Sequence, residues 1–243
     1  MHRTKSIVRA IAVLGGTVLL SLLPNRAAVA QSTLFNIPST DVVPKKKTYL
    51  EFDFISHLKS HADGGFQIYV PRAVFGVGSG IEVGVNVSVA DALAADQPVY
   101  VSPNLKWQFY NNEDKGVAVA AGGLIYTPVA HRAGADTYGF LYSIASKKWK
   151  SSYGPRLTGG AYRLPGLRDG TGTKGGAIVG YEQPLSRKAS FVTDWFSGKN
   201  AFGYVTLGFS FGLPKNGLLN MGYSIGNHGQ GNNALFVYYG ITF

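Results

Sequence analysis

Histidines and serines are the side chains from which a hydrolytic site could be built in this chain. Such a site needs a Ser and a His within hydrogen-bond reach, with an acid or amide orienting the His. Beyond residue 30 the histidines are His57, His61, His131 and His228, and none of them begins a His-x-Ser pair. His57 and His61 have serines and Asp63 nearby in sequence, but polar residues in loops are ordinarily just solvated. We therefore predict no catalytic residues and no enzyme.

Metal, phosphate and nucleic-acid sites find as little support. The chain has no cysteine, and the four-residue spacing of His57 and His61 suits a helix rather than the strand end expected there. Residues 170–176 are rich in glycine but lack the strand and helix that flank a phosphate-binding loop. No zinc-finger, helix-turn-helix or RNP-like motif occurs. We predict no metal, no cofactor and no nucleic-acid partner.

The elements that must position any site follow a period of two. Leu50 and Phe52 alternate with Glu51 and Asp53, so a β-strand would place the two acids on one face and the apolar residues on the other. The same period predicts twelve strands, at residues 48–55, 66–77, 81–89, 99–110, 117–126, 138–145, 157–164, 175–182, 189–196, 202–211, 218–225 and 234–243. Pro71 lacks an N–H group, so we also expect a bulge at positions 71–72.

The connections between these strands alternate in length. Those after even-numbered strands are mostly short, and those after odd-numbered strands are mostly longer and polar. This alternation, with an even strand count, is typical of a bacterial transmembrane barrel whose two ends lie in the periplasm. Two connections disagree: residues 147–155 are long for a turn, and residues 197–200 are short for a loop.

The N-terminus has the layout of a cleavable secretory signal. Arg3, Lys5 and Arg9 precede an apolar run over residues 10–23, too short to span a membrane, and an Ala-x-Ala cleavage site ends at Ala30. We predict a signal peptide at 1–30, an irregular periplasmic segment at 31–46 and a barrel at 47–243. The leader contains four basic residues, so the formal charge of +10 falls to +6 on cleavage.

The uncharged face of each strand is the one expected to touch lipid, because a charge at mid-bilayer costs about 2–4 kcal/mol. The charged residues would then face inward, whereas a soluble β-sandwich would bury the apolar face instead. The absence of cysteine, the leader and the even strand count favour the all-β transmembrane barrel, in the outer membrane and in contact with its lipid. The predicted pore-lining residues are Glu51, Asp53, Glu82, Lys106, Arg163, Glu182 and Asp194.

The final strand carries the most specific signature. Residues 235–243, Leu-Phe-Val-Tyr-Tyr-Gly-Ile-Thr-Phe, resemble the terminal strand of Gram-negative outer-membrane proteins, which ends in an aromatic residue after alternating apolar ones. The resemblance implies that Tyr239, Ile241 and Phe243 are recognised by the barrel assembly machinery. Residues 193–198, Thr-Asp-Trp-Phe-Ser-Gly, with the Gly-rich strands that follow, are weakly similar to porin-like proteins of the phenol-degradation MetA-pathway type.

Three functions remain open on this basis. The first is a porin-like passive channel for small solutes, or for small apolar compounds if the interior is aromatic; the pattern does not identify the solute. The second is a non-conducting structural or adhesive barrel acting through its outer loops, since charges could pair across the interior and residues 31–46 could fold into the periplasmic mouth. The third is an outer-membrane hydrolase, for which the residue spacing gives the least support.

Overall fold

The structure is a computed structural model that describes residues 32–90, 97–229 and 231–243. The predicted signal peptide and its cleavage site lie outside these residues. Among the residues described, no helix is both long enough and apolar enough to span a membrane.

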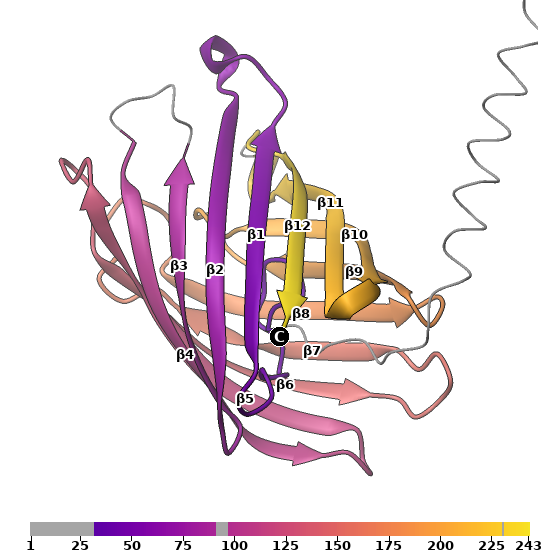
Figure 1. Cartoon of the computed structure of the whole chain (residues 1–243). Coiled ribbons are helices and arrows are strands. Elements are labelled where there is room, and N and C mark those ends of the chain that lie inside the picture. The colour runs from indigo at the N-terminus through magenta and orange to yellow at the C-terminus, as the bar shows by residue number, and fades with distance from the viewer. Residues whose placement is uncertain (1–31, 91–96, 230) are drawn as a thin grey trace, which may run out of the picture.

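Twelve antiparallel strands form one closed barrel, in which each strand pairs with its neighbours in sequence and β1 pairs with β12 (Figure 1). All twelve predicted strands are confirmed, with bounds shifted by a few residues. They are β1 (Thr48–His57), β2 (Phe66–Gly78), β3 (Ile81–Ala90), β4 (Val99–Asn112), β5 (Val117–Ala130), β6 (Tyr138–Lys148), β7 (Arg156–Arg163), β8 (Gly175–Pro184), β9 (Ala189–Phe196), β10 (Tyr204–Leu213), β11 (Gly217–Gly226) and β12 (Ala234–Thr242).

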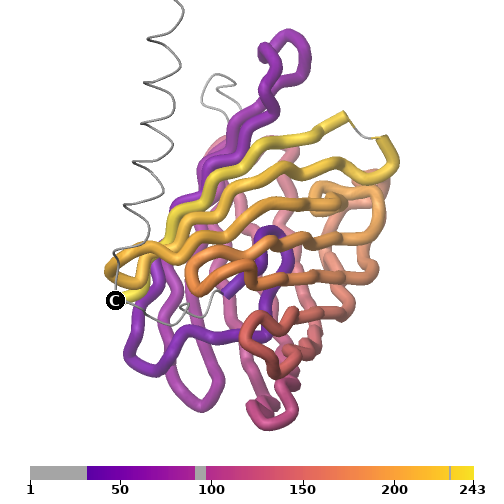
Figure 2. Tube along the Cα trace, turned by 90° about the vertical axis from the view of Figure 1, so that its right-hand side faces the viewer, coloured from indigo at the N-terminus to yellow at the C-terminus, as the bar shows by residue number. Residues whose placement is uncertain are grey.

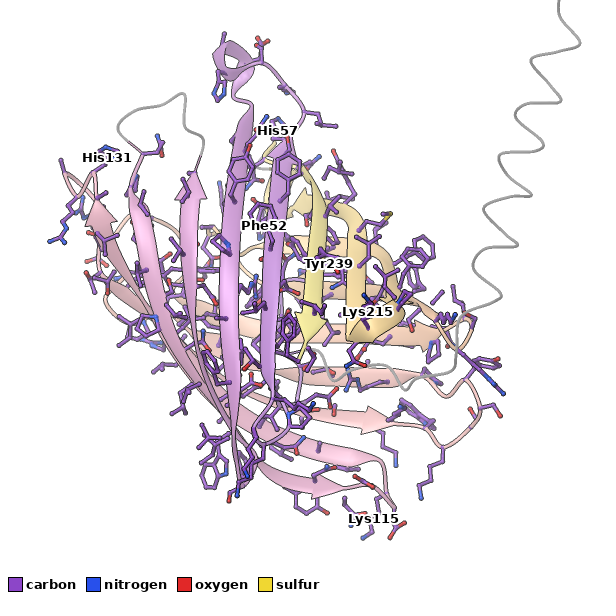
Figure 3. All side chains as sticks on the ribbon, viewed as in Figure 1. Phe52, His57, Lys115, His131, Lys215 and Tyr239 are labelled. Carbon is purple, nitrogen blue, oxygen red and sulfur yellow. The ribbon has the colours of Figure 1, made fainter. Side chains whose placement is uncertain are left out.

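The two faces of the strands have the polarity expected of a membrane barrel. Phe52 is 48% exposed and Tyr239 is 46% exposed, and Figure 3 shows both on the outer wall of the adjacent strands β1 and β12. Glu51 and Asp53, on the opposite face of β1, are buried. The apolar side chains therefore cover the outside of the barrel, and the charges between them point inward.

Two expectations about the backbone are wrong. The register between β1 and β2 runs without interruption through Pro71, and the irregularity of β2 lies between Gly76 and Gly78, where it pairs with β3. Further along, β10 begins at Tyr204, so the connection after β9 spans residues 197–203 and is a loop of ordinary length. Only the connection at 149–155 still departs from the predicted alternation. The end with the short turns, where β1 begins and β12 ends, is called the periplasmic end below.

Candidate functional site in the barrel interior

Residues 32–43 lie inside the barrel, and we call this segment the plug (Figure 2). Its first part is a tight hairpin, because Leu34 N–H donates to the carbonyl of Ile37 at 2.9 Å and Ser39 N–H donates to the carbonyl of Ser32 at 3.1 Å. Leu34, Phe35 and Ile37 are all at most 2% exposed. The interior therefore has a packed centre of its own, although the wall turns its apolar face outward.

The tip of the plug is held by one carboxylate of the wall. Three successive backbone N–H groups, of Phe35, Asn36 and Ile37, donate to Oδ2 of Asp194 at 3.0, 2.7 and 3.2 Å. Asp194 lies on β9 and is 2% exposed. A carboxylate that accepts several N–H groups of one turn forms charge-assisted hydrogen bonds, which are stronger than neutral ones. Asp194 therefore fixes both the position and the conformation of this turn.

Side-chain contacts extend this anchorage around the wall. Asn36 Nδ2 donates to Oγ1 of Thr206 at 2.5 Å, and the ring of Phe35 lies 4.7 Å from that of Phe236. Gly180 on β8 leaves room for two apolar side chains of the plug, because a Cβ atom there would lie 2.5 Å from Cδ2 of Leu34 and 2.6 Å from Cδ1 of Ile37. The tip therefore packs against β8, β9, β10 and β12.

A buried ion pair fastens the two ends of the plug hairpin to β3 and β4. Lys106 Nζ lies 3.0 Å from Oε1 of Glu82, and both side chains are almost completely buried. The same ammonium donates to the carbonyl of Ser32 at 2.8 Å and to that of Ser39 at 3.3 Å. Glu82 accepts from the hydroxyl of Ser32 and, at 2.7 Å, from Val43 N–H. The plug therefore supplies hydrogen-bond partners for the remaining polar groups of Glu82 and Lys106. A buried ion pair needs such partners to offset the cost of removing its charges from water.

A second ionic group lies nearer the periplasmic end. The guanidinium of Arg156 on β7 contacts Glu182 on β8 through two nitrogens and reaches Oδ2 of Asp41 in the plug at 2.5 Å. Beside it, Oγ1 of Thr40 lies 2.6 Å from Oγ of Ser146 on β6. Together with the Glu82–Lys106 pair, these contacts tie the plug to four further strands.

A third group joins charges of the wall to one another. Arg72 on β2 donates to Oδ2 of Asp53 at 2.9 Å and lies 3.2 Å from Oε1 of Glu51, which also accepts the hydroxyl proton of Tyr49 through its other oxygen. Oδ1 of Asp53 and Oδ1 of Asp194 have no hydrogen-bond partner among the described residues. The interior of the wall is therefore ionic on the β1–β4 side.

Six of the seven predicted pore-lining residues face the interior: Glu51, Asp53, Glu82, Lys106, Glu182 and Asp194. Arg163 does not. It is exposed and shares the outer face of β7 with Leu157, while Tyr162 beside it is buried inside. Because Arg163 is the last residue of the strand, its charge lies near the membrane boundary, where exposure to the outside costs little.

Two functional residues were absent from the predicted set. Arg156 was outside the predicted seventh strand by one residue, and Arg72 was assigned to the expected bulge. The alternation of faces along a strand could have identified Arg156. Arg156 and Arg163 are seven positions apart, so they must lie on opposite faces of one strand. Tyr239 and Ile241 lie on the outward face of β12, and Phe243 is exposed directly after the end of this strand. The recognition of these three predicted assembly residues stays a prediction.

Aromatic rings line the outer half of the interior. Tyr126 stacks on Tyr138 with ring centroids 4.7 Å apart, and Phe202 lies 5.8 Å from Tyr126 and 5.6 Å from Phe140. A cavity of about 450 Å³ opens between the outer loops, and a smaller one of about 120 Å³ lies between the rings and the plug. Phe202 lines both cavities. The two spaces therefore adjoin, and the plug closes the inner one.

His57 and His131 each bond to a backbone carbonyl group. Nδ1 of His57 bonds to the carbonyl of Asn233, and Nδ1 of His131 bonds to the carbonyl of Gln97 at 3.0 Å. Figure 3 shows both residues at the outer end of the barrel. Within the described parts of the chain, no group of three or more His, Asp or Glu side chains is arranged to hold a metal ion.

No protein-family model and no curated protein sequence matches this chain. The fold is similar to that of an outer-membrane channel from Pseudomonas putida F1, with a TM-score of 0.52 and 12% identity over 84% of this chain and 98% of the other. It is also similar to outer membrane phospholipase A from Escherichia coli, with a TM-score of 0.50 and 14% identity over 89% of this chain and 98% of the other. The chain has the closed twelve-stranded fold of Gram-negative outer-membrane β-barrels. Identities this low extend to the fold and not to activity.

Proposed function

We propose that this barrel is a gated passage for small, largely apolar solutes across the outer membrane, and that the plug closes it in the conformation described here. The observation that carries the proposal is the pair of adjoining cavities that share Phe202 and end at the plug. Aromatic rings, among them Tyr126, Phe140 and Phe202, line part of the inner cavity, and polar or charged groups such as Arg72 and Lys106 line the rest. Sites for small organic molecules combine apolar and aromatic surface with polar groups that orient the ligand. A cavity of the inner one's size approaches the roughly 150 Å³ that holds a single benzene ring in an engineered protein.

The way in which the plug is held supports a gate rather than a permanent filling. The plug contributes no strand to the barrel, and its only bridge within the described residues is internal, between Thr33 and Pro38. Its removal would leave every wall strand paired. Apart from the packing of Leu34, Phe35 and Ile37, its anchors are hydrogen bonds and ion pairs that water could replace. Withdrawal of the plug would therefore not require the wall to open.

The absence of cysteine permits a direct test by a single engineered disulfide. The variant Thr40→Cys/Ser146→Cys replaces two hydroxyls whose oxygens are 2.6 Å apart, so an oxidised pair should lock the plug to β6. Uptake of the apolar dye N-phenyl-1-naphthylamine into whole cells is then measured before and after reduction. We expect slow uptake when the pair is oxidised and wild-type uptake when it is reduced. Ser146→Cys alone is the control and should not respond.

A non-conducting barrel is the second candidate, and the filled periplasmic half of the interior favours it. It predicts equal dye uptake by cells with and without the protein, and no difference between the locked and the reduced variant. That result would contradict the gated passage. An enzymatic role has no comparable support, because the recorded bonds of His57 and His131 go to backbone carbonyl groups.

A further inference from the structure

Charge is divided unequally along the barrel axis. The periplasmic turns and strand ends carry ten Lys and Arg residues, at positions 45–47, 115, 147, 148, 150, 187, 188 and 215, against two acids, Glu113 and Asp114. The interior has the opposite balance, with six acids against Arg72, Lys106 and Arg156. Figure 3 shows Lys115 and Lys215 at the end of the molecule away from His57 and His131. The positive surplus of the mature chain therefore lies at the periplasmic rim.

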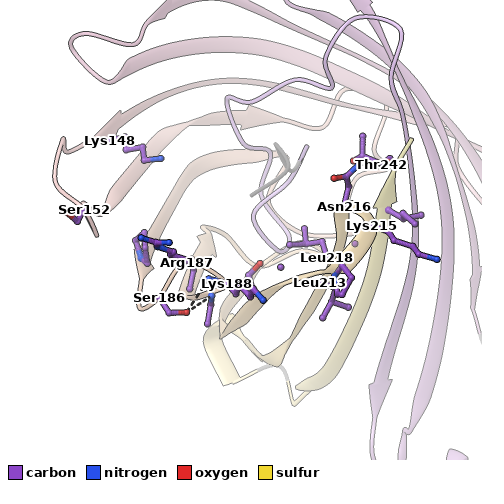
Figure 4. A pocket seen from close by; sticks show the side chains of 18 of the residues that line it. Lys148, Ser152, Ser186, Arg187, Lys188, Leu213, Lys215, Asn216, Leu218 and Thr242 are labelled. Carbon is purple, nitrogen blue, oxygen red and sulfur yellow. Dashed lines mark hydrogen bonds between the residues drawn. The ribbon is translucent and has the colours of Figure 1, made fainter. Parts of the chain in front are cut away.

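This rim encloses a cavity of about 840 Å³ (Figure 4). It is bounded by the turns after β6, β8 and β10 and by the end of β12. Lys148 and Arg187 line one side, and the apolar residues Leu213 and Leu218 line the other. None of the described residues that line it is Asp or Glu.

Neighbouring acids do not neutralise this cavity. The nearest interior acids along β7 and β8 belong to the group in which Arg156 pairs with Glu182 and Asp41. Beyond them the interior has a net negative charge, which opposes the onward movement of an anion. An anion attracted to the rim would therefore stay in the cavity, so the cavity is better suited to docking than to transit.

The position of the cations separates a soluble ligand from lipid. Lys148 shares a face of β6 with the buried residues Ser146 and Ile144, and that face points into the barrel rather than toward the bilayer. Lys148 and Arg187 stand on separate turns and the apolar residues lie across the cavity from them (Figure 4), an arrangement that matches an extended chain better than a single phosphate. The volume is within the range of about 300–1,000 Å³ that is usual for ligand sites.

We propose that this cavity docks an acidic peptide segment of a periplasmic partner, with carboxylates near Lys148 and Arg187 and apolar side chains against Leu213 and Leu218. The proposal does not depend on passage of solutes through the barrel. If no peptide binds, the proposed gated passage is unaffected. If no solute passes, the proposed peptide docking is unaffected.

The test uses the full mature chain in nanodiscs of zwitterionic phosphatidylcholine and a rhodamine-labelled hexaglutamate peptide, with fluorescence anisotropy as the readout. We expect Lys148→Gln/Arg187→Gln to weaken binding about tenfold. The matched control Lys45→Gln/Lys115→Gln removes the same charge from the rim outside the cavity. At 0.15 M salt, where screening acts over about 8 Å, it should change binding by less than about twofold.

Three outcomes would overturn the proposal. Equal weakening by both variants would mean that the peptide responds to the general charge of the rim. Release of the peptide when phosphatidylglycerol is added to the nanodiscs would mean that lipid head groups occupy the cavity. If the wild-type protein does not bind the peptide at all, acidic peptides are not ligands of this cavity.

Discussion

The two halves of the barrel interior are built from different materials. The plug fills the periplasmic half, where charged residues of the wall hold it. Only its tip extends farther, to Asp194, Thr206 and Phe236 near the outer ends of β9, β10 and β12. The outer half is lined by aromatic rings and contains open space. The difference teaches that the resistance to passage lies in the periplasmic half, while the chemical preference for a solute lies in the outer half. Changes in one half should therefore alter opening, and changes in the other should alter binding.

Deletion of residues 32–43 should have the largest effect, since it removes the filling of the periplasmic half and leaves all twelve strands paired. We expect persistent conductance steps in planar bilayers where the intact protein gives few or none. Deletion of residues 60–63, in the outer loop after β1 and outside both cavities, is the control and should leave the conductance unchanged. A deleted variant that migrates as a folded barrel on unheated gels but shows no steps would place the resistance elsewhere.

Asp194→Ala should partly open the barrel, because three backbone N–H groups of the plug lose their acceptor. Loss of about 2 kcal/mol from the closed state would raise the ratio of open to closed channels roughly 30-fold. Asp194→Asn retains one carbonyl oxygen and should have a smaller effect. Open probability in single-channel records is the measurement. Equal values for wild type and Asp194→Ala would show that this carboxylate is not an anchor.

Gly180→Val should push the apolar tip of the plug away from β8, since the new side chain needs space held by Leu34 and Ile37. Overpacking of this kind costs about 1–3 kcal/mol, which corresponds to roughly a fivefold to 150-fold faster cleavage of the plug by thermolysin. Gly159→Val is the matched control, because a Cβ at that outward position meets nothing within 4 Å. Cleavage at the same rate in both variants would contradict the packing described here.

Phe202→Ala should have the smallest effect and should be confined to the outer half. The variant removes one ring from both cavities, and an aromatic contact contributes about 0.5–1.5 kcal/mol beyond its buried area. We expect the purified protein to bind N-phenyl-1-naphthylamine about twofold to twelvefold more weakly, with its conductance unchanged. If Phe202→Ala changed the open probability instead, the outer half would also control opening, and the two halves would not have separate roles.

The wall of this barrel could be predicted from the sequence because its signals are local. A period of two needs only a few neighbouring residues, and the cost of a charge in lipid then assigned Glu51, Asp53 and Glu82 to the inside. The same reasoning failed at Arg163, because the strand reaches the membrane boundary there and an outward-facing charge no longer has to be placed in lipid. Residues 71–72 show a second limit, since the prediction placed a bulge at a proline that the ladder between β1 and β2 accommodates.

The plug could not be predicted in the same way. Residues 32–43 have no period, and their partners are distant in sequence, as with Phe35 and Asp194, which are separated by 159 positions. Composition allowed the possibility that this part of the chain enters the mouth, but nothing local specified the turn at 35–37 or its acceptor. The inward charges were predicted as the lining of a pore, and the structure shows most of them holding the plug or one another.

The pairing of β1 with β12 has a consequence for the order in which the molecule is made. The plug precedes β1 in the chain, yet the seam that surrounds it closes only when β12 is present. A chain truncated before β12 would have an open wall and an unenclosed N-terminal segment. Insertion of the final hairpin therefore determines both when the cylinder is sealed and when the plug is enclosed by the wall.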